Sequence, residues 1–435
     1  MVTLTKTQQH IVTCLVESTE TVVIATSAGC GKTTTLNAYC DTVGRLIAAG
    51  GALRNEAILF VAPTGAAATL LQCGFLLGTR VPACTIARLC LMKAFWENLA
   101  FQAGANSLVF ITVIIDEALM TTASNFSTLY GRLEQTGCRF RFVFVGDDRQ
   151  LTAVGTGILS STVFRKLLGG GPIVCTLRER HRFVCEDLRR LAAALDDRNF
   201  NTICLYMTER SLASTGIRLP AAGSSDGVLY LAALNEKVDK YNARAIAIGA
   251  AAGKSVYTIV CPKTNTIVKR FMDGPVVVQK NQKTRNVVNG TMGELMQLSG
   301  TPYEFIDPLY PFAHVLKNDL KLRAKIATKE HAEFEIKPVK EAGGSWLPLA
   351  TGHAMTIHKA QGSTFTPPGC GGDRVYHTVV VDVDGCQSFN ELLVALTRTR
   401  TLGQLKIKGD IDRVLSAMAA DEVDTDVKWF RQICL

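Results

Sequence analysis

The 435-residue sequence lacks paired cysteines, long apolar runs and low-complexity segments. Its 14 cysteines are scattered singly, without a C-x-x-C pair or a Cys/His spacing typical of zinc. No apolar run reaches the roughly 20 residues that a membrane-spanning helix needs. The first residues form neither an apolar leader nor an Arg/Ser-rich presequence. We therefore expect a soluble intracellular protein, without membrane contact, whose thiols are free and buried in a reducing compartment.

The composition is that of a folded protein with several domains. Hydrophobic residues make up 47% and charged residues 20%, which excludes a disordered chain. The length predicts about two to four domains. The net charge of +9 fits a polyanionic partner such as nucleic acid but does not require one.

Apolar runs in the first 175 residues predict a parallel sheet that is buried on both faces. These runs are residues 22–25, 58–62, 109–115 and 140–145. The stretch 34–49 has helical length and spacing. We expect a doubly wound α/β domain that binds its ligand at the carboxyl ends of the strands.

A second α/β unit is expected to start near Leu177. Residues 228–232 and 379–383 have the pattern of its strands, and this half of the chain has no second phosphate loop. Between them, residues 262–348 contain short β-like runs and Gly/Pro turns. This stretch predicts a small β-rich insertion into the second domain.

A phosphate-binding loop is predicted at residues 26–33, T-S-A-G-C-G-K-T. It matches G-x-x-x-x-G-K-[ST], except that Thr26 replaces the first glycine. In such a loop, backbone N–H groups and the following helix N-terminus bind phosphate. Lys32 is expected to reach the β- and γ-phosphates, and Thr33 to ligate Mg²⁺. The residues expected around the nucleotide are Ser27, Ala28, Gly29, Cys30, Gly31, Lys32, Thr33 and Thr34.

Acidic and amide side chains follow the next two predicted strands. Asp116 is expected to hold Mg²⁺, and Glu117 to polarise the attacking water. In the sequence G-D-D-R-Q-L, Gln150 is expected to sense the γ-phosphate. Together with the phosphate loop, these residues predict hydrolysis of a nucleoside triphosphate.

The order phosphate loop, D-E, G-D-x-x-Q-L resembles a superfamily 1 helicase. L-T-K-T-Q-Q at residues 4–9 resembles the Q motif, which implies that Gln8 bonds the adenine edge. Residues 61–67 resemble motif Ia. Residues 84–88 resemble motif Ib, although Ala87 stands where His is common.

Motifs of the same family are found in the second half. L-R-E-R-H-R at residues 177–182 resembles motif IV, which implies that Arg182 is an arginine finger. Residues 356–364, T-I-H-K-A-Q-G-S-T, resemble motif V, with Gly362 near the nucleotide. V-A-L-T-R-T-R at residues 394–400 resembles motif VI, with Arg398 as a second finger. Arginines from the half without a phosphate loop imply that hydrolysis is coupled to domain closure.

Two further segments narrow the resemblance to superfamily 1B, the PIF-type, RecD-like and Dda-like helicases. They are N-x-x-V-x-x-x-N at residues 235–242 and V-N-G-x-x-G at residues 288–293. The resemblance implies an α/β fold of two RecA-like parallel-sheet P-loop-type domains with an SH3-like insertion in the second. The expected domains are 1–176, with a small wedge subdomain near 91–107, then 177–275 with 349–435, and the insertion 276–348.

The resemblance implies an ATP- and Mg²⁺-dependent DNA helicase of replication, repair or recombination. It would move 5′→3′ on single-stranded DNA and unwind duplex DNA that has a 5′ tail. We expect a monomer that works beside replication proteins, in the nucleus or at the replication site of a eukaryote or its virus. The compact chain suits a viral, phage or mobile-element enzyme. The expected nucleic-acid contacts are Thr64, Thr85, Thr356, His358 and Lys359.

Phe95, Trp96 and Phe101 lie in the wedge region, where an aromatic ring either stacks on a base or packs in a helix core.

Two other functions remain open. One is a superfamily 1 RNA helicase of a positive-strand RNA virus. The other is a P-loop NTPase without strand separation, such as a kinase or an ATP-gated scaffold. Unwinding of matched DNA and RNA duplexes separates the first from a DNA helicase, and stimulation of ATPase activity by single-stranded DNA separates the second.

Overall fold

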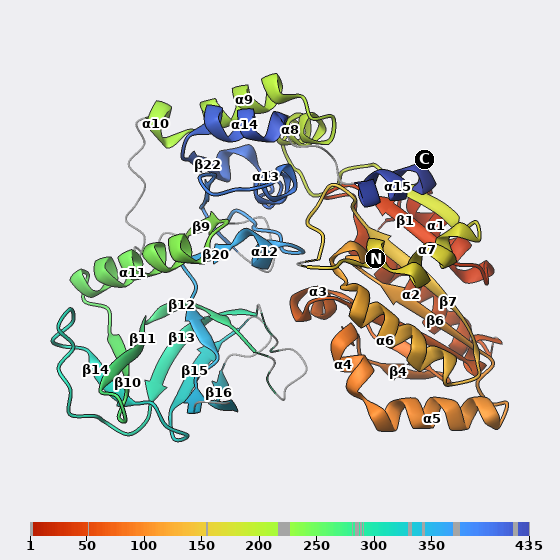
Figure 1. Ribbon diagram of the computed structural model, residues 1–435, viewed down its shortest axis with the longest axis horizontal. Coiled ribbons are helices and arrows are strands. Elements are labelled where there is room, and N and C mark those ends of the chain that lie inside the picture. Colours follow the sequence, from red (N-terminus) through yellow and green to blue (C-terminus); the bar gives the residue numbers. More distant parts are fainter. Residues whose placement is uncertain are drawn as a thin grey trace. The chain divides into compact units, whose positions relative to one another are not determined.

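A computed structural model describes residues 3–50, 52–153, 155–215, 227–280, 282, 287, 289, 291–328, 333–341, 344–368, 375–420 and 425–434. The chain divides into two compact units, shown in Figure 1. The first consists of Met1–Val184 and Asp421–Leu435, and the second of Cys185–Ala420. The second unit thus begins at Cys185 rather than at residue 177. Residues 421–435, expected in the second domain, belong to the first unit.

The first unit is an α/β layer structure. Its helices are α1 (Lys6–Glu17), α2 (Lys32–Ala48), α3 (Gly65–Leu70), α4 (Ile86–Leu91), α5 (Lys93–Gly104), α6 (Ala123–Glu134), α7 (Thr162–Gly169) and α15 (Thr425–Cys434), with 3₁₀ turns η1 (Ala52–Asn55), η2 (Ala118–Met120) and η3 (Ile158–Ser160). Its strands are β1 (Val22–Thr26), β2 (Glu56–Ala62), β3 (Gly74–Leu76), β4 (Thr79–Val81), β5 (Cys84–Thr85), β6 (Phe110–Ile115), β7 (Arg139–Gly146) and β8 (Ile173–Leu177).

These strands form one eight-stranded sheet in the order β4-β3-β2-β6-β7-β1-β8, with β5 paired to β2. Along the part of the sheet with the order β2-β6-β7-β1-β8, all pairs are parallel, and the β3–β4 hairpin is antiparallel. Side chains along β2 alternate between two cores: Ile58 and Phe60 face α1 and α2, whereas Leu59 and Val61 face α4 to α6. The sheet is therefore buried on both faces, as the continuous apolar runs predict.

The sheet order brings the predicted catalytic segments to one edge. The strands β6, β7 and β1 are neighbours and all run parallel. The phosphate loop follows β1, Asp116 follows β6, and Asp147 follows β7. Because the carboxyl ends of parallel strands share an edge, these three segments meet there.

The second unit contains a parallel sheet in the order β20-β9-β21-β22. These strands are β20 (Ala354–Thr356), β9 (Val228–Ala232), β21 (Thr378–Asp382) and β22 (Leu405–Lys408). The surrounding helices are α8 (Glu186–Asp196), α9 (Phe200–Glu209), α10 (Leu212–Thr215), α11 (Asn235–Ala251), α12 (Ile357–Ala360), α13 (Phe389–Leu396) and α14 (Ile411–Ala419), with the 3₁₀ turn η4 (Leu402–Gln404).

A β-rich region is inserted between β9 and β20. Antiparallel pairs form a five-stranded sheet in the order β16-β15-β13-β12-β19. Its strands are β12 (Gly274–Val278), β13 (Met292–Ser299), β15 (Arg323–Ala327), β16 (Phe334–Ile336) and β19 (Leu349–Thr351). The strands β10 (Val256–Cys261), β11 (Thr266–Met272) and β14 (His314–Lys317) form a second sheet, and β17 (Val339–Glu341) pairs with β18 (Gly344–Trp346). The strand β11 lies within the β-rich stretch predicted at residues 262–348, whereas β10 precedes it, and both precede residue 276, where the family resemblance places the start of the insertion.

The α/β fold with two parallel-sheet units is confirmed. The cysteines that the structure describes are all free, but only Cys30, Cys40, Cys90 and Cys175 are fully buried. Among the described residues, no helix has both the length and the apolar character needed to cross a membrane.

Candidate functional site

The phosphate loop connects β1 to α2 in the first unit. Gly29 and Gly31 have φ angles of 81° and 79°, in the left-handed region that favours glycine. Thr26 is the last residue of β1, and its hydroxyl donates a 3.1 Å hydrogen bond to the carbonyl of Gly146. Because Thr26 is part of an extended strand, a β-branched residue suits this position. The departure from the glycine pattern therefore leaves the loop intact.

Two other segments of the chain pack closely against these glycines. A Cβ at Gly29 would lie 2.9 Å from Arg182 Cβ, and one at Gly31 would lie 2.7 Å from Gln8 Nε2. The Gly29 carbonyl accepts hydrogen bonds from the backbone N–H groups of His181 and Arg182, at 2.8 and 3.1 Å. These bonds hold Arg182 in the first unit, beside the phosphate loop. Its role as an arginine finger stays a prediction.

Gln8 is fixed by the start of α1. Its Oε1 accepts the N–H of Thr5 at 3.0 Å, and its own N–H donates to Thr5 Oγ1 at 3.2 Å, a reciprocal helix cap. The residue is 3% exposed. The cap orients Nε2 toward Gly31, so the structure places Gln8 at the loop while its contact with adenine stays a prediction.

Lys32 is the centre of a buried charge cluster. Its ammonium group donates a 3.0 Å hydrogen bond to Glu117 Oε1. Burial works to lower the pKa of Lys32, but Glu117, Asp116 and Asp147 outweigh it, so the pKa lies above its usual value. Burial raises the pKa of both Asp116 and Asp147 to about 6, although Lys32 opposes both shifts. Three carboxylates around one ammonium group leave an excess of negative charge.

Glu117 has an uncommon backbone conformation. Its φ and ψ are 50° and 44°, in the left-handed region, and its N–H donates to Asp116 Oδ1 at 2.9 Å. Such a conformation costs on the order of 1–3 kcal/mol and is typically kept at functional sites. Here it accompanies a buried carboxylate that contacts Lys32, and the role of Glu117 as a water-polarising base stays a prediction.

The loop after β7 holds Gln150 in place. Asp147 Oδ2 accepts Gln150 Nε2 at 2.7 Å, and Asp147 Oδ1 accepts the N–H of Arg149 at 3.1 Å. Gln150 is 3% exposed, and its Oε1 has no hydrogen-bond partner among the described residues. A buried acceptor of this kind suits an attacking water or a protonated phosphate. Asp147, which the sequence analysis does not single out, is thus part of the site, and the only sequence signal is its place in G-D-x-x-Q-L.

The residues fit a magnesium–nucleotide complex. Within the described ranges, no group of three or more His, Cys, Asp or Glu side chains forms a metal site by itself. Mg²⁺ typically takes one or two protein ligands and fills its shell with phosphate oxygens and water. Thr33, at the start of α2, and Asp116 would hold it, and its charge would offset the carboxylate excess. Bound Mg²⁺ neutralises charge that develops on the phosphates.

In the second unit, motif VI is buried. Arg398 is 1% exposed, and its guanidinium donates to the carbonyls of Val394 and Ser363 at 2.8 and 3.4 Å. Gly362 has a φ of 77°. Its neighbour Gln361 is 5% exposed, and neither amide atom has a hydrogen-bond partner in the described part of the chain. Gln361 lies within the segment that resembles motif V, but its residue type and position alone predict no role.

The predicted nucleic-acid threonines share one geometry. Thr64, Thr85 and Thr356 each precede a helix and accept a backbone N–H on their hydroxyl oxygen, at 3.2, 3.2 and 3.3 Å. Thr64 lies two residues after β2, and Thr85 and Thr356 are the last residues of β5 and β20; each of these strands belongs to a parallel pair. A capping hydroxyl uses its oxygen as acceptor and keeps its hydrogen for donation. The same hydroxyl can therefore cap the helix and donate to a phosphate.

The other candidate contacts lie near motif V. His358 Nδ1 is 3.8 Å from Glu391 Oε1, and Lys359 is exposed. Asn242 on α11 exchanges hydrogen bonds with the backbone of Ala354, so it supports β20 just before the motif. Val288 and Gly290 of the V-N-G-x-x-G segment lie outside the described residues.

The wedge-region aromatics have different environments. Trp96 is 5% exposed, and its indole N–H donates to the Leu89 carbonyl at 2.8 Å. Phe95 packs against the same core. Phe101, in contrast, is 71% exposed on α5. Trp96 and Phe95 are thus core residues, and of these three rings Phe101 is the exposed one.

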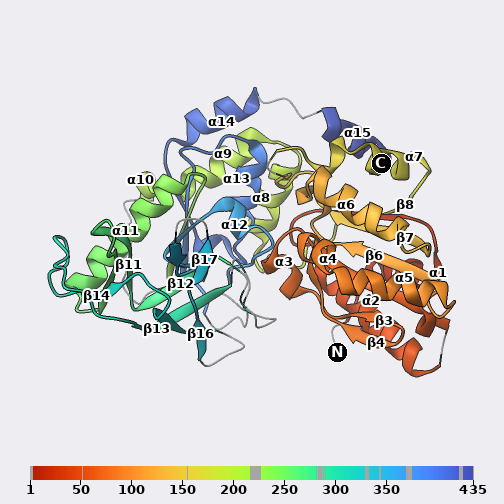
Figure 2. The same cartoon turned by 60° about the horizontal axis from the view of Figure 1, so that its bottom comes forward.

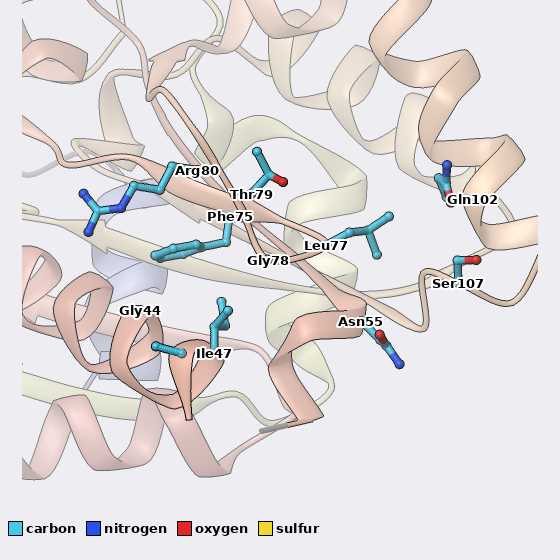
Figure 3. A pocket seen from close by; sticks show the side chains of 11 residues that line it. Gly44, Ile47, Asn55, Phe75, Leu77, Gly78, Thr79, Arg80, Gln102 and Ser107 are labelled. Carbon is cyan, nitrogen blue, oxygen red and sulfur yellow. The ribbon is translucent and has the colours of Figure 1, made fainter. Parts of the chain in front are cut away.

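A separate hollow of about 1010 Å³ lies beside the β3–β4 hairpin. Figure 3 shows Ile47, Phe75 and Leu77 along it, with Arg80 at one end and Gln102 and Ser107 at the other. None of the predicted catalytic residues lines it.

Comparison with known proteins agrees with this architecture. Residues 3–214 match the AAA domain family. No curated protein shows significant similarity to the sequence. The Pif1 helicase from Candida albicans is similar over 99% of both chains, with 18% identity and a TM-score of 0.62. The Bacteroides Pif1 helicase solved with ADP-AlF3 and single-stranded DNA covers 98% of this chain and 94% of its own, with 17% identity and a TM-score of 0.61. A Pif1 structure on DNA unwinding at forked duplexes by two coordinating helicases covers 93% and 92%, with 16% identity and a TM-score of 0.62.

Proposed function

We propose that this chain, which has the fold of the Pif1 helicases of superfamily 1B, is an ATP-dependent DNA helicase. It hydrolyses ATP at the phosphate loop and moves 5′→3′ along single-stranded DNA, which separates duplex DNA ahead of it. Magnesium accompanies the nucleotide. The direction of movement is inferred from the family resemblance of motif V together with the segments 235–242 and 288–293.

The observation that carries the proposal is the buried cluster of Lys32, Glu117, Asp116 and Asp147 beside Gln150. The strands β1, β6 and β7 bring these residues together from three distant segments. Lys32 would bind the γ-phosphate, Glu117 would accept a proton from water, and the unpaired Oε1 of Gln150 would orient that water. A structural role alone does not account for three carboxylates that burial disfavours.

DNA binding rests on the repeated helix-cap geometry of Thr64, Thr85 and Thr356. Hydroxyls at strand ends contact phosphates without reading base sequence, as a translocating enzyme requires. Arg182 and Arg398 are proposed to stabilise charge on the γ-phosphate in the transition state. The β-rich insertion and the segment near residues 91–107 are proposed as the SH3-like and wedge subdomains.

Unwinding of duplexes that carry only a 5′ or only a 3′ single-stranded tail tests the proposal. We expect ATP-dependent unwinding of the 5′-tailed DNA, and little of the 3′-tailed DNA. Preference for a 3′ tail would reverse the polarity, and strong preference for RNA duplexes would indicate an RNA helicase. ATPase activity that single-stranded DNA does not stimulate would indicate a P-loop NTPase without translocation.

A further inference from the structure

The helix α15 follows the second unit in sequence but is part of the first unit's core. Val427 and Phe430 are 6% and 4% exposed within that core. The rings of Phe430 and Phe164 stack with centroids 6.3 Å apart. Figure 2 shows α15 beside α7, the helix that carries Phe164. Apolar contacts therefore dock α15 on the first unit, so the docking does not depend on the polar contacts of the helix.

Polar contacts of α15 fall into two groups. Asp426, in the first turn, accepts the Ser160 hydroxyl at 3.1 Å and pairs with Arg165. The Arg165 guanidinium also lies 5.0 Å from the Trp429 ring centroid. This group ties the start of α15 to η3 and α7.

The second group reaches the catalytic edge of the sheet. Arg431, in the last turn, donates from Nε to Asp148 Oδ2 and forms an ion pair with it. The Asp148 side chain is 15% exposed, and that of Arg431 34%. A charge-assisted hydrogen bond that is shielded from water holds its partners more firmly than a surface ion pair.

Asp148 lies in the middle of the loop that positions Gln150. Its neighbour Asp147 accepts Gln150 Nε2 at 2.7 Å and the N–H of Arg149 at 3.1 Å. These short-range bonds shape the loop internally. The bond from Arg431 connects the loop to a packed helix, which restricts where the whole loop lies relative to the sheet.

We propose that Arg431 is a positioning residue for ATP hydrolysis: through Asp148 it holds the loop 147–150 so that Gln150 presents Oε1 to the attacking water. Arg431 acts on the reaction only through Asp148. The inference rests on the proposed function and adds a residue outside every helicase motif of the sequence. Loss of the contact lets the loop sample other positions, which lowers the fraction of molecules ready for chemistry. Nucleotide affinity, which depends on the phosphate loop, is unchanged.

The test compares Arg431→Ala with Asp426→Asn, which weakens the docking of the same helix without touching the loop. We expect Arg431→Ala to lower kcat of the DNA-stimulated ATPase on the order of tenfold, which corresponds to about 1.4 kcal/mol of transition-state stabilisation. Its KM for ATP and its Kd for a fluorescent ADP analogue stay within about twofold of the unsubstituted protein. Asp426→Asn should keep kcat within about twofold of the unsubstituted protein, even if its melting temperature falls as much as that of Arg431→Ala.

A double-mutant cycle with Asp148→Asn gives a second readout. Asp148→Asn should lower kcat as Arg431→Ala does, and the two changes together should cost no more than either alone, because they break one contact. Arg431→Lys should be more active than Arg431→Ala. It replaces Arg431→Ala as the test variant if that protein does not fold. Unchanged kcat in Arg431→Ala, additive effects in the cycle, or an equal loss in Asp426→Asn would each overturn the proposal. If single-stranded DNA does not stimulate the ATPase, the helicase proposal fails, and the basal ATPase of the same variants still tests Arg431.

Discussion

The ammonium group of Lys32 donates a 3.0 Å hydrogen bond to the carboxylate of Glu117. The cation of the phosphate loop and the proposed catalytic base thus neutralise each other. A bound γ-phosphate competes with Glu117 for Lys32. Its arrival would release Glu117 to act on water. Binding of the phosphate and activation of the base would therefore occur in the same step.

Lys32→Ala is expected to abolish hydrolysis, with kcat at least ~100-fold lower, because it removes the cation that contacts the developing charge. Steady-state ATPase measurement with and without single-stranded DNA checks this. Lys93→Ala is the matched control, because Lys93 is exposed in the same unit and pairs only with Glu97 at the surface. Turnover at the unsubstituted level in Lys32→Ala would refute the phosphate-loop assignment.

Glu117→Gln should separate binding from turnover. The amide cannot accept a proton from water, so kcat falls ~100-fold or more. ATP affinity stays the same or increases, because Lys32 no longer has to leave a carboxylate. Titration of a fluorescent ATP analogue measures the affinity. Weaker binding together with retained turnover would show that Glu117 supports the nucleotide rather than the reaction.

Arg398→Ala should lower turnover by ~100-fold or more with little change in ATP affinity, as expected of an arginine finger. Because Arg398 is 1% exposed and bonded to two carbonyls, thermal unfolding of the variant is measured alongside. Arg413→Ala, at an exposed ion pair with Asp384, is the matched control. Equal losses of binding and turnover would contradict the finger role.

Thr26→Val should destabilise the first unit by about 1 kcal/mol, because the Gly146 carbonyl loses its donor while the side-chain volume is kept. That corresponds to about 2–4 °C in melting temperature for a unit of this size. Thr26→Ser, which keeps the hydroxyl, should stay nearer the unsubstituted protein. A fully stable Thr26→Val would mean that the hydrogen bond does not tie β1 to β7.

Acid should destabilise the second unit through His353. Burial, followed by the nearby Lys254, lowers the pKa of His353 to about 4 from the usual 6.5. Between these values the unfolded chain binds a proton that the folded chain excludes, so stability is lost as the pH falls from about 6.5 to 4. The loss from this group is about 3 kcal/mol.

Urea unfolding followed from pH 7 to 4 measures this loss. His353→Phe should flatten the pH dependence, since it removes the titrating group. His377→Phe, a change at an exposed histidine of the same unit, should leave it unchanged. The same acid slope in His353→Phe and the unsubstituted protein would assign the loss to other groups.

The parts of the site that follow a buried strand were predictable from sequence. Continuous apolar runs mark parallel strands, and ligands bind where such strands end, so the sequence predicts that Lys32, Asp116 and Gln150 lie at one edge of the sheet. Their individual roles stay predictions until the variants above are measured.

Features that depend on contacts distant in sequence were not predictable. The segment that contains Arg182 is held in the first unit by two backbone bonds to Gly29, and no local pattern encodes that pairing. Burial of Arg398 likewise depends on the Ser363 carbonyl, contributed by motif V. The contact between Arg431 and Asp148 joins a helix that carries no helicase motif to a loop that does. Tertiary packing decides each of these.

Val427 and Phe430 complete a core whose other fully buried members come from residues 23–168. During synthesis the ribosome therefore makes the whole second unit before it supplies these two side chains. The first unit therefore stays incomplete, with part of its apolar surface exposed, while the second unit is synthesised. A ligand that binds the first unit would stabilise it in this incomplete state.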